Sequence, residues 1–168
     1  MAHHEHKRSA PSAIPCAIVT VSDTRTEETD TSGAAIRERL LAAGHEVVHY
    51  AIVPDEPERI RAVIAEVRTA ARARVVIVNG GTGISRRDRT YEAVAAMLDK
   101  TLDGFGELFR FLSYQDIGSA AMLSRAIAGL SGELVIFSVP GSSGAVKLAM
   151  DKLIVPELGH VVGESAKG

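Results

Sequence analysis

One stretch decides the fold: Val75-Val76-Ile77-Val78-Asn79-Gly80-Gly81-Thr82-Gly83-Ile84-Ser85-Arg86-Arg87-Asp88-Arg89-Thr90. It begins with four apolar β-branched residues, a pattern typical of a buried strand in a parallel sheet. The glycines that follow let the backbone turn sharply and bring N–H groups close to an anion. Thr90 stands where a helix N-cap is expected, ahead of a helix over residues 91–98. A strand, a glycine loop and a helix start in this order predict a phosphate-binding edge of an α/β sheet.

The totals of the chain exclude several classes of protein. Its 168 residues fit one domain with room for a core, and 46% hydrophobic with 24% charged residues is near the globular average. A net charge of −2 gives no basic footprint for nucleic acid. No apolar run approaches the roughly 20 residues of a membrane span, and no secretory leader is expected. The single cysteine, Cys16, allows no intrachain disulfide and favours a cytoplasmic location.

The N-terminal residues 1–14 have no apolar period and are expected to form a mobile tail, followed by one domain over residues 15–163. Three of the six histidines, His3, His4 and His6, lie in this tail. They are interpreted as solvated, although such a tract can also bind a metal.

Apolar runs and helical periodicity predict the remaining elements. Strands are expected over residues 16–21, 46–53, 75–78, 125–128 and 133–139, the fourth at an edge of the sheet. Helices are expected over residues 34–43, 58–71, 91–98, about 105–114, 117–123 and 145–155, the last ending before Pro156. The alternation of strands and helices predicts an α/β domain with a parallel sheet.

Four polar segments follow four of these strands, and the carboxyl ends of parallel strands face the same side. The segments are Ser22-Asp23, Pro54-Asp55, residues 80–88 and residues 141–144, and they are expected along one rim. Ser22 and Asp23 fit either ligand contact or the turn chemistry of a strand end. Asp55 fits the N-cap of the helix over residues 58–71, with Glu58 at capping-box spacing.

The chemistry of the rim suits a phosphate ligand. Two glycine loops that open helices offer N–H groups to phosphates. Asp23, Asp55 and Asp88 can hold Mg²⁺, which takes a few carboxylates together with phosphate oxygens and water. Arg86, Arg87 and Arg125 can neutralise charge during displacement at phosphorus. The glycine loop matches neither the dinucleotide fingerprint nor the Walker pattern, so the residues alone indicate a phosphate-binding α/β protein.

Several motifs within roughly residues 14–160 resemble those of the MoaB/Mog family of molybdenum cofactor biosynthesis proteins, and they occur in the same order along the chain. They are Val21-Ser22-Asp23, Val53-Pro54-Asp55-Glu56, Gly80-Gly81-Thr82-Gly83 with Arg87-Asp88 and Thr90, Gly104-Phe105-Gly106-Glu107, Leu123-Ser124-Arg125, and Val139-Pro140-Gly141-Ser142. The stretch over residues 104–118 resembles the MoaB branch more than the Mog branch.

The resemblance implies a three-layer α/β/α sandwich with a mostly parallel sheet, assembled as a homotrimer or homohexamer. It implies adenylation of the terminal phosphate of molybdopterin by Mg-ATP, with release of pyrophosphate. Asp55 and Asp88 match the family's catalytic aspartates, which act through Mg²⁺. The implied binding residues are Ser22, Asp23, Gly80, Gly81, Thr82, Gly83, Ser124, Arg125, Pro140, Gly141 and Ser142.

The sequence departs from the family pattern at three places. Asn79 replaces a common threonine, Tyr91 replaces a frequent proline, and the loop after Gly141 lacks a usual proline. None of these changes removes an implied catalytic group. Two other functions stay open: a molybdopterin-binding or carrier protein without catalysis, and a nucleotide pyrophosphatase.

Overall fold

The structure, a computed structural model, describes residues 12–167. Six strands in this part of the chain form one sheet in the order β2-β1-β3-β6-β5-β4. The strands are β1 (Pro15–Val21), β2 (Glu46–Val53), β3 (Val75–Asn79), β4 (Lys100–Thr101), β5 (Ile127–Ser131) and β6 (Leu134–Val139). The helices are α2 (Thr31–Ala42), α3 (Pro57–Ala70), α4 (Thr90–Ala95), α5 (Asp103–Ile117), α6 (Ser143–Ala149) and α7 (Val155–Ser165), with a 3-10 helix η1 (Gly118–Leu123) and a π-helix η2 (Met150–Ile154).

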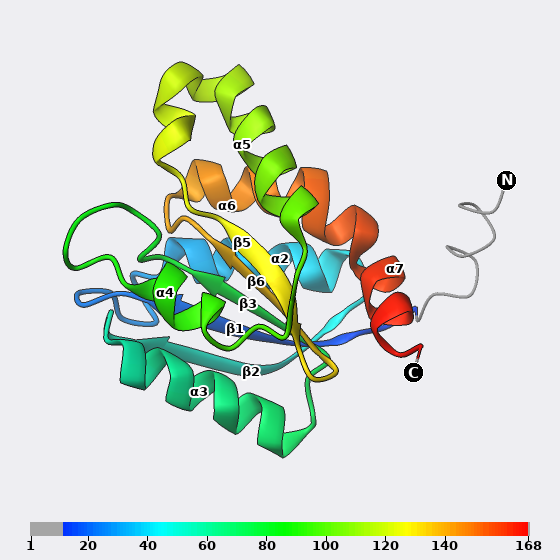
Figure 1. The fold of residues 1–168 in the computed structure, drawn as a ribbon. Coiled ribbons are helices and arrows are strands. Elements are labelled where there is room, and N and C mark those ends of the chain that lie inside the picture. The colour runs from blue at the N-terminus through cyan, green and yellow to red at the C-terminus, as the bar shows by residue number, and fades with distance from the viewer. Residues whose placement is uncertain (1–11, 168) are drawn as a thin grey trace, which may run out of the picture.

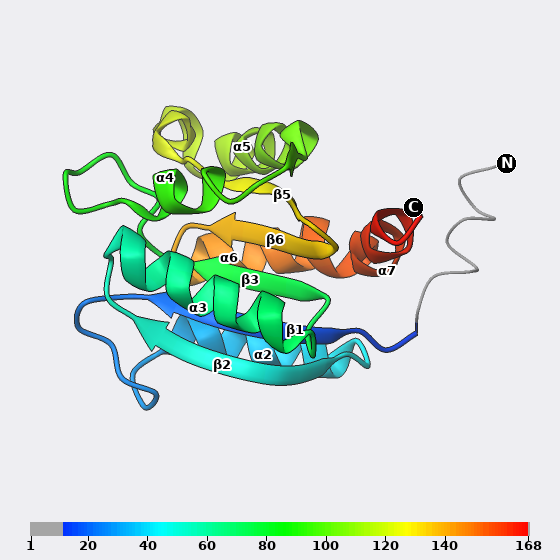
Figure 2. The same cartoon turned by 60° about the horizontal axis from the view of Figure 1, so that its bottom comes forward.

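Helices cover both faces of the sheet, so the predicted three-layer α/β/α sandwich is confirmed. Side chains of α2, α5, α6 and α7 share one hydrophobic core with one face of the strands. Side chains of α3 and α4 share a second core with the other face. Figure 1 shows α5 and η1 projecting beyond the sheet, and Figure 2 shows α3 in front of the strands with α2 and α6 behind them. No helix within residues 12–167 is long and apolar enough to cross a membrane.

The strand at the centre of the opening stretch is buried on both sides. Residues Val75 to Val78 are all 0% exposed, with Val75 and Ile77 in one core and Val76 and Val78 in the other. β3 pairs with β1 and β6, parallel to both. An unbroken apolar run is the sequence such a strand requires, because neither face meets water.

The N-terminal boundary differs from the prediction at Ile14. This side chain is 1% exposed, and its N–H donates to Nδ1 of His45 at 3.3 Å, so it belongs to the core and not to a tail. The predicted tail over residues 1–11, with His3, His4 and His6, lies outside the described residues. Helix α2 begins at Thr31, three residues before its predicted start.

Two predicted N-caps are wrong. Helix α3 begins at Pro57 with Glu56 as its N-cap residue, which makes no side-chain capping bond, and Asp55 lies one residue before that cap. Helix α4 begins at Thr90 itself, after Arg89, and ends at Ala95, three residues before the predicted end. In both cases the side chain expected to cap its own helix faces a distant segment.

The second half of the chain differs from the prediction in two places. β5 is not an edge strand, because Lys100 and Thr101 form β4 alongside it. The C-terminal helical run continues through Pro156 to Ser165. A π-helical turn precedes the proline, with the N–H of Val155 donating to the carbonyl of Met150 five residues back. Proline is tolerated there because it stands in the first turn of α7, where its missing N–H costs little.

Candidate functional site

The four strand ends meet along one rim, as the parallel topology requires. The N–H of Ser22, just after β1, donates to the carbonyl of Val53 at the end of β2, at 2.9 Å. The N–H of Gly80, just after β3, donates to the carbonyl of Val139 at the end of β6, at 3.0 Å. The segments after β1, β2, β3 and β6 are therefore brought together.

The glycines of the rim allow close approach of backbones and carboxylates. Gly80 and Gly81 have φ of +105° and +64°, conformations that side-chain-bearing residues rarely adopt. A Cβ on Gly81 would lie 2.3 Å from Oδ2 of Asp55, and a Cβ on Gly141 would lie 3.0 Å from Cα of Gly80. The two glycine loops thus touch each other, and the first of them touches Asp55.

Asp55 is buried, at 6% exposure, under the loop that follows β3. Its Oδ1 accepts the N–H of Arg89 at 3.1 Å and faces the hydroxyl of Thr90 at 3.5 Å. These long-range partners are the reason that neither Asp55 nor Thr90 caps its own helix. Burial raises the pKa of Asp55 above its usual value, the N–H of Arg89 opposes this, and the charges of Asp88 and Asp23 raise the pKa further.

Asp23 and Ser22 make protein contacts at the outer side of the rim. Asp23 receives two bonds of 2.7 Å from the guanidinium of Arg87, which lower its pKa to about 2, and one of 3.1 Å from the N–H of Asp55. Oγ of Ser22 accepts the N–H groups of Thr24 and Arg25, at 3.2 and 3.0 Å, which is the turn chemistry of a strand end.

Asp88 lies above the glycine loop. Its Oδ2 accepts the N–H and the hydroxyl of Ser85, at 3.0 and 2.6 Å, and a Cβ on Gly83 would lie 2.6 Å from it. Oδ1 of Asp88 and Oδ2 of Asp55 receive no hydrogen bond from residues 12–167.

Asp55 and Asp88 offer carboxylate oxygens that would suit a magnesium ion whose remaining ligands are phosphate oxygens and water. Within residues 12–167 there is no cluster of three or more His, Cys, Asp or Glu side chains that could hold a metal alone. Asp55 and Asp88 flank the glycine loop, with one oxygen of each left unbonded. One or two carboxylates, phosphate oxygens and water make up the usual magnesium shell.

Two cavities are lined by residues of the segment that follows β3, and Asp88 lines both. The first, about 340 Å³, is named here the glycine-loop cavity. The second, about 550 Å³, is named the arginine cavity. The glycine-loop cavity is lined by Gly81, Thr82, Gly83, Asp88, Phe109, Ser113, Ile117, Leu123, Ser124, Pro140, Gly141, Ser142 and Ala145. The arginine cavity is lined by Pro57, Arg61, Ile84, Ser85, Arg86, Asp88, Arg89, Glu92, Ala93 and Arg125.

Comparison with known proteins places this architecture in a family. Residues 17–160 match a family model described as a probable molybdopterin binding domain. Molybdenum cofactor biosynthesis protein B of Bacillus cereus is 58% identical over 161 residues, which cover 95% of each chain. The chain belongs to the MoaB/Mog family of molybdenum cofactor biosynthesis proteins.

Solved structures of this family superpose closely. One crystal structure of a molybdenum cofactor biosynthesis protein B has a TM-score of 0.92 at 56% identity, covering 95% of this chain and all of the other. The tungsten cofactor synthesizing protein MoaB from Pyrococcus furiosus has a TM-score of 0.85 at 38% identity, over 94% of this chain and 100% of that chain. A role in molybdenum cofactor biosynthesis follows for this member of the family.

Within this MoaB/Mog site, Arg125 holds the loop and is not a free cation. Its guanidinium donates to the carbonyls of Gly83, at 2.6 and 3.0 Å, and of Asp88, at 3.1 Å. It also pairs with the carboxylate of Glu92 and lies 5.1 Å from the ring centre of Tyr91. Arg86, in contrast, lines the arginine cavity with no bond from its guanidinium to residues 12–167.

Ser124, unlike Arg125, has a side chain that makes no hydrogen bond to the described residues. Its Oγ is buried and has no hydrogen-bond partner within residues 12–167, and the residue lines the glycine-loop cavity. An unpaired buried hydroxyl is costly unless a ligand or water satisfies it. The structure therefore separates two adjacent predicted residues: Ser124 faces the glycine-loop cavity, whereas Arg125 is bound into the loop.

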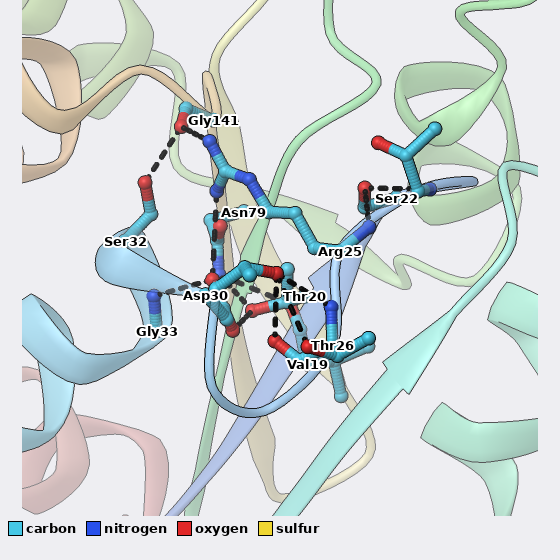
Figure 3. Close-up of polar contacts among 12 residues, drawn as sticks. Val19, Thr20, Ser22, Arg25, Thr26, Asp30, Ser32, Gly33, Asn79 and Gly141 are labelled. Carbon is cyan, nitrogen blue, oxygen red and sulfur yellow. Dashed lines mark hydrogen bonds and ion pairs between the residues drawn. The ribbon is translucent and has the colours of Figure 1, made fainter.

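Sequence reasoning missed the polar cluster beneath the rim, which Figure 3 shows. Asp30 is 2% exposed and accepts hydrogen bonds from the hydroxyls of Thr20 and Tyr50, at 2.6 Å each. Asn79, at the end of β3, donates to Thr20 at 2.9 Å. Burial alone would raise the pKa of Asp30, but these hydroxyls, the N–H of Gly33 and nearby Arg25 lower it overall. The sequence around Asp30 has a helix-cap pattern but no signal for the distant partners Thr20 and Tyr50.

Proposed function

We propose that this chain adenylates molybdopterin: an oxygen of the pterin's terminal phosphate attacks the α-phosphorus of ATP. The bond from that phosphorus to the bridging oxygen breaks, and pyrophosphate leaves. The observation that carries the proposal is the glycine loop, which lines the glycine-loop cavity and is flanked by Asp55 and Asp88. The N–H groups of Gly81, Thr82 and Gly83 have no acceptor within residues 12–167, so three consecutive donors remain for phosphate oxygens.

The proposal assigns the chain's residues to three tasks. The pterin occupies the glycine-loop cavity, next to the unpaired hydroxyl of Ser124, and the phosphates of ATP lie along Gly80–Gly83. Asp55 and Asp88 would hold Mg²⁺, which neutralises phosphate charge when it is bound. Arg86 offsets the charge of the departing pyrophosphate from the arginine cavity. Catalysis then consists of alignment and fixed charge, as is usual for displacement at phosphorus.

The test is pyrophosphate release from Mg-ATP and molybdopterin by the wild type, Asp88→Asn and Glu133→Gln. Glu133 precedes β6, at the opposite end of the sheet from the rim, so it serves as a matched loss of one carboxylate. We expect Asp88→Asn to lower the release rate about 100-fold or more, as for other losses of charge stabilisation, and Glu133→Gln to match the wild type.

One outcome would count against the enzyme, and another against the role of Asp88. If the wild type binds molybdopterin but releases no pyrophosphate, the chain is a binding or carrier protein on the same fold. If Asp88→Asn releases pyrophosphate at the wild-type rate, the assignment of Asp88 is wrong. Melting temperatures of all three proteins show whether each variant is folded.

We also propose that the chain assembles as a homotrimer or homohexamer. Helices α5 and η1 present six large apolar side chains to solvent at half exposure or more: Leu108, Phe111, Tyr114, Ile117, Met122 and Leu123. A patch of this kind marks an interaction surface. Light scattering of the purified protein gives the mass, and a monomer would contradict the proposal.

A further inference from the structure

The carbonyl of Gly141, in the second glycine loop, is held by two side chains from the other end of the chain. Nη2 of Arg25 donates to it at 3.3 Å, and Oγ of Ser32 donates to it at 2.7 Å. Both donors are distant in sequence, since 116 and 109 residues separate them from Gly141. Figure 3 shows the two side chains converging on this one oxygen.

Asp30 fixes both donors. Its Oδ1 accepts Nη1 of Arg25 at 3.4 Å, so the guanidinium bridges Asp30 and Gly141. The same oxygen accepts the N–H of Gly33 at 2.9 Å, which caps α2 and sets the position of Ser32 in its first turn. Ser32 is 0% exposed. Arg25 cannot move away without breaking its ion pair with this buried carboxylate, and Ser32 is held in the helical turn that the carboxylate caps.

Holding one carbonyl sets the direction of the next N–H. A trans peptide is planar, with its C=O and N–H pointing in opposite directions. The Gly141–Ser142 peptide directs its C=O toward Arg25 and Ser32, so the N–H of Ser142 points away from them. That N–H has no acceptor within residues 12–167, and Ser142 is an exposed residue that lines the glycine-loop cavity.

We infer that Arg25 and Ser32 are positioning residues for ligand binding: they orient the Gly141–Ser142 peptide so that the N–H of Ser142 binds a phosphate oxygen of the ligand. This inference rests on the proposed function, because it takes the phosphate to be that of molybdopterin. Neither side chain touches the ligand. The loop contains Gly141, and a glycine backbone is free to rotate. Arg25 and Ser32 prevent a rotation that would turn the N–H of Ser142 out of the cavity.

The test compares Arg25→Met, Ser32→Ala and the double variant with the wild type. The matched control is Arg39→Met: Arg39 also lies on the α2 side, but it pairs with Asp151, at 2.7 Å, away from the loop. The arginine side chains are similarly exposed, 31% for Arg25 and 22% for Arg39.

The first measurement is the NMR order parameter of the Ser142 amide in the free proteins. We expect a value near 0.85 in the wild type and in Arg39→Met, falling toward about 0.6 in the double variant. The second is the ratio of the affinities for molybdopterin and for the same pterin without its phosphate. Loss of one oriented charge-assisted hydrogen bond lowers this ratio about tenfold in the double variant.

The affinity ratio distinguishes a loss of positioning from a general distortion of the cavity, because a distorted cavity weakens the binding of both pterins equally. An unchanged order parameter at Ser142 in the double variant would overturn the inference whatever the ligand. An altered order parameter with an unchanged affinity ratio would overturn its link to the phosphate. If the wild type binds neither pterin, the proposed function itself fails, and the order parameter alone decides whether the two side chains hold the loop.

Discussion

Replacing Gly81 with alanine tests how closely the rim is packed. The residue has φ of +64°, and alanine in this region loses roughly 1–2 kcal/mol. Its Cβ would lie 2.1 Å from Oγ1 of Thr90 and 2.3 Å from Oδ2 of Asp55. These contacts are shorter than any that real atoms allow, so both side chains must move.

The movement adds a second penalty to the strain. Asp55 would lose the N–H of Arg89, at 3.1 Å, and its contact with Thr90, at about 1 kcal/mol for each hydrogen bond. We expect Gly81→Ala to lower the free energy of unfolding by about 3 kcal/mol in total. For a domain of this size, that corresponds to a fall in Tm of roughly 6–12 °C.

Gly132→Ala is the matched control. Gly132 has φ of +60°, but a Cβ there would meet no atom within 4 Å. Only the backbone strain of roughly 1–2 kcal/mol is expected for this variant. Urea unfolding followed by circular dichroism, at unchanged m-value, gives both energies. If Gly81→Ala loses no more stability than Gly132→Ala, Asp55 and Thr90 do not pack closely against Gly81 in the folded protein.

Two further predictions follow from the buried carboxylates of Asp55 and Asp30. The folded pKa of Asp55 lies above its usual 3.8, so its favourable contribution is present below that pH and is lost as the pH rises through the folded pKa. Without magnesium or nucleotide, Asp55→Asn should therefore melt above the wild type at pH 7; a lower Tm at pH 7 would contradict this. The folded pKa of Asp30 is lowered, so its contribution is present above the unfolded value of 3.8 and is lost as the pH falls through the folded pKa. Asp30→Asn should lose about 3 kcal/mol at pH 7, and a loss that persists undiminished in melts at pH 2 would refute this explanation.

The strands and the rim were predictable because they depend on simple rules. The apolar run of Val75–Val78 can be accommodated only where both faces of a strand are buried. Parallel strands then bring their carboxyl ends to one side, which is why Asp55 and the glycine loops were expected together. Register, turns and individual partners were not needed for that conclusion.

The errors arose where a long-range partner competed with a local pattern. Around Asp55 the sequence has every local mark of a helix cap, but the N–H of Arg89, 34 residues away, binds its carboxylate instead. Thr90 is drawn toward the same carboxylate. Asp30 does cap its helix through the N–H of Gly33, yet Thr20, Arg25 and Tyr50 also bind its carboxylate, and no local pattern indicates these three partners. Pro156 predicts the end of a helix, and the π-helical turn that lets the helical run continue has no reliable sequence signature.

The order of strands in the sheet has a consequence for how the chain is made. β6 is the last strand to be synthesised, yet it lies between β3 and β5. Until Val139 has left the ribosome, both of those strands keep an open edge, and four of the five residues of β3, Val75–Val78, are apolar. Open apolar edges are the places where nascent chains pair with one another, so aggregation competes with folding until β6 is available to cover them. A chain that stops before β6 retains both open edges and lacks the second glycine loop.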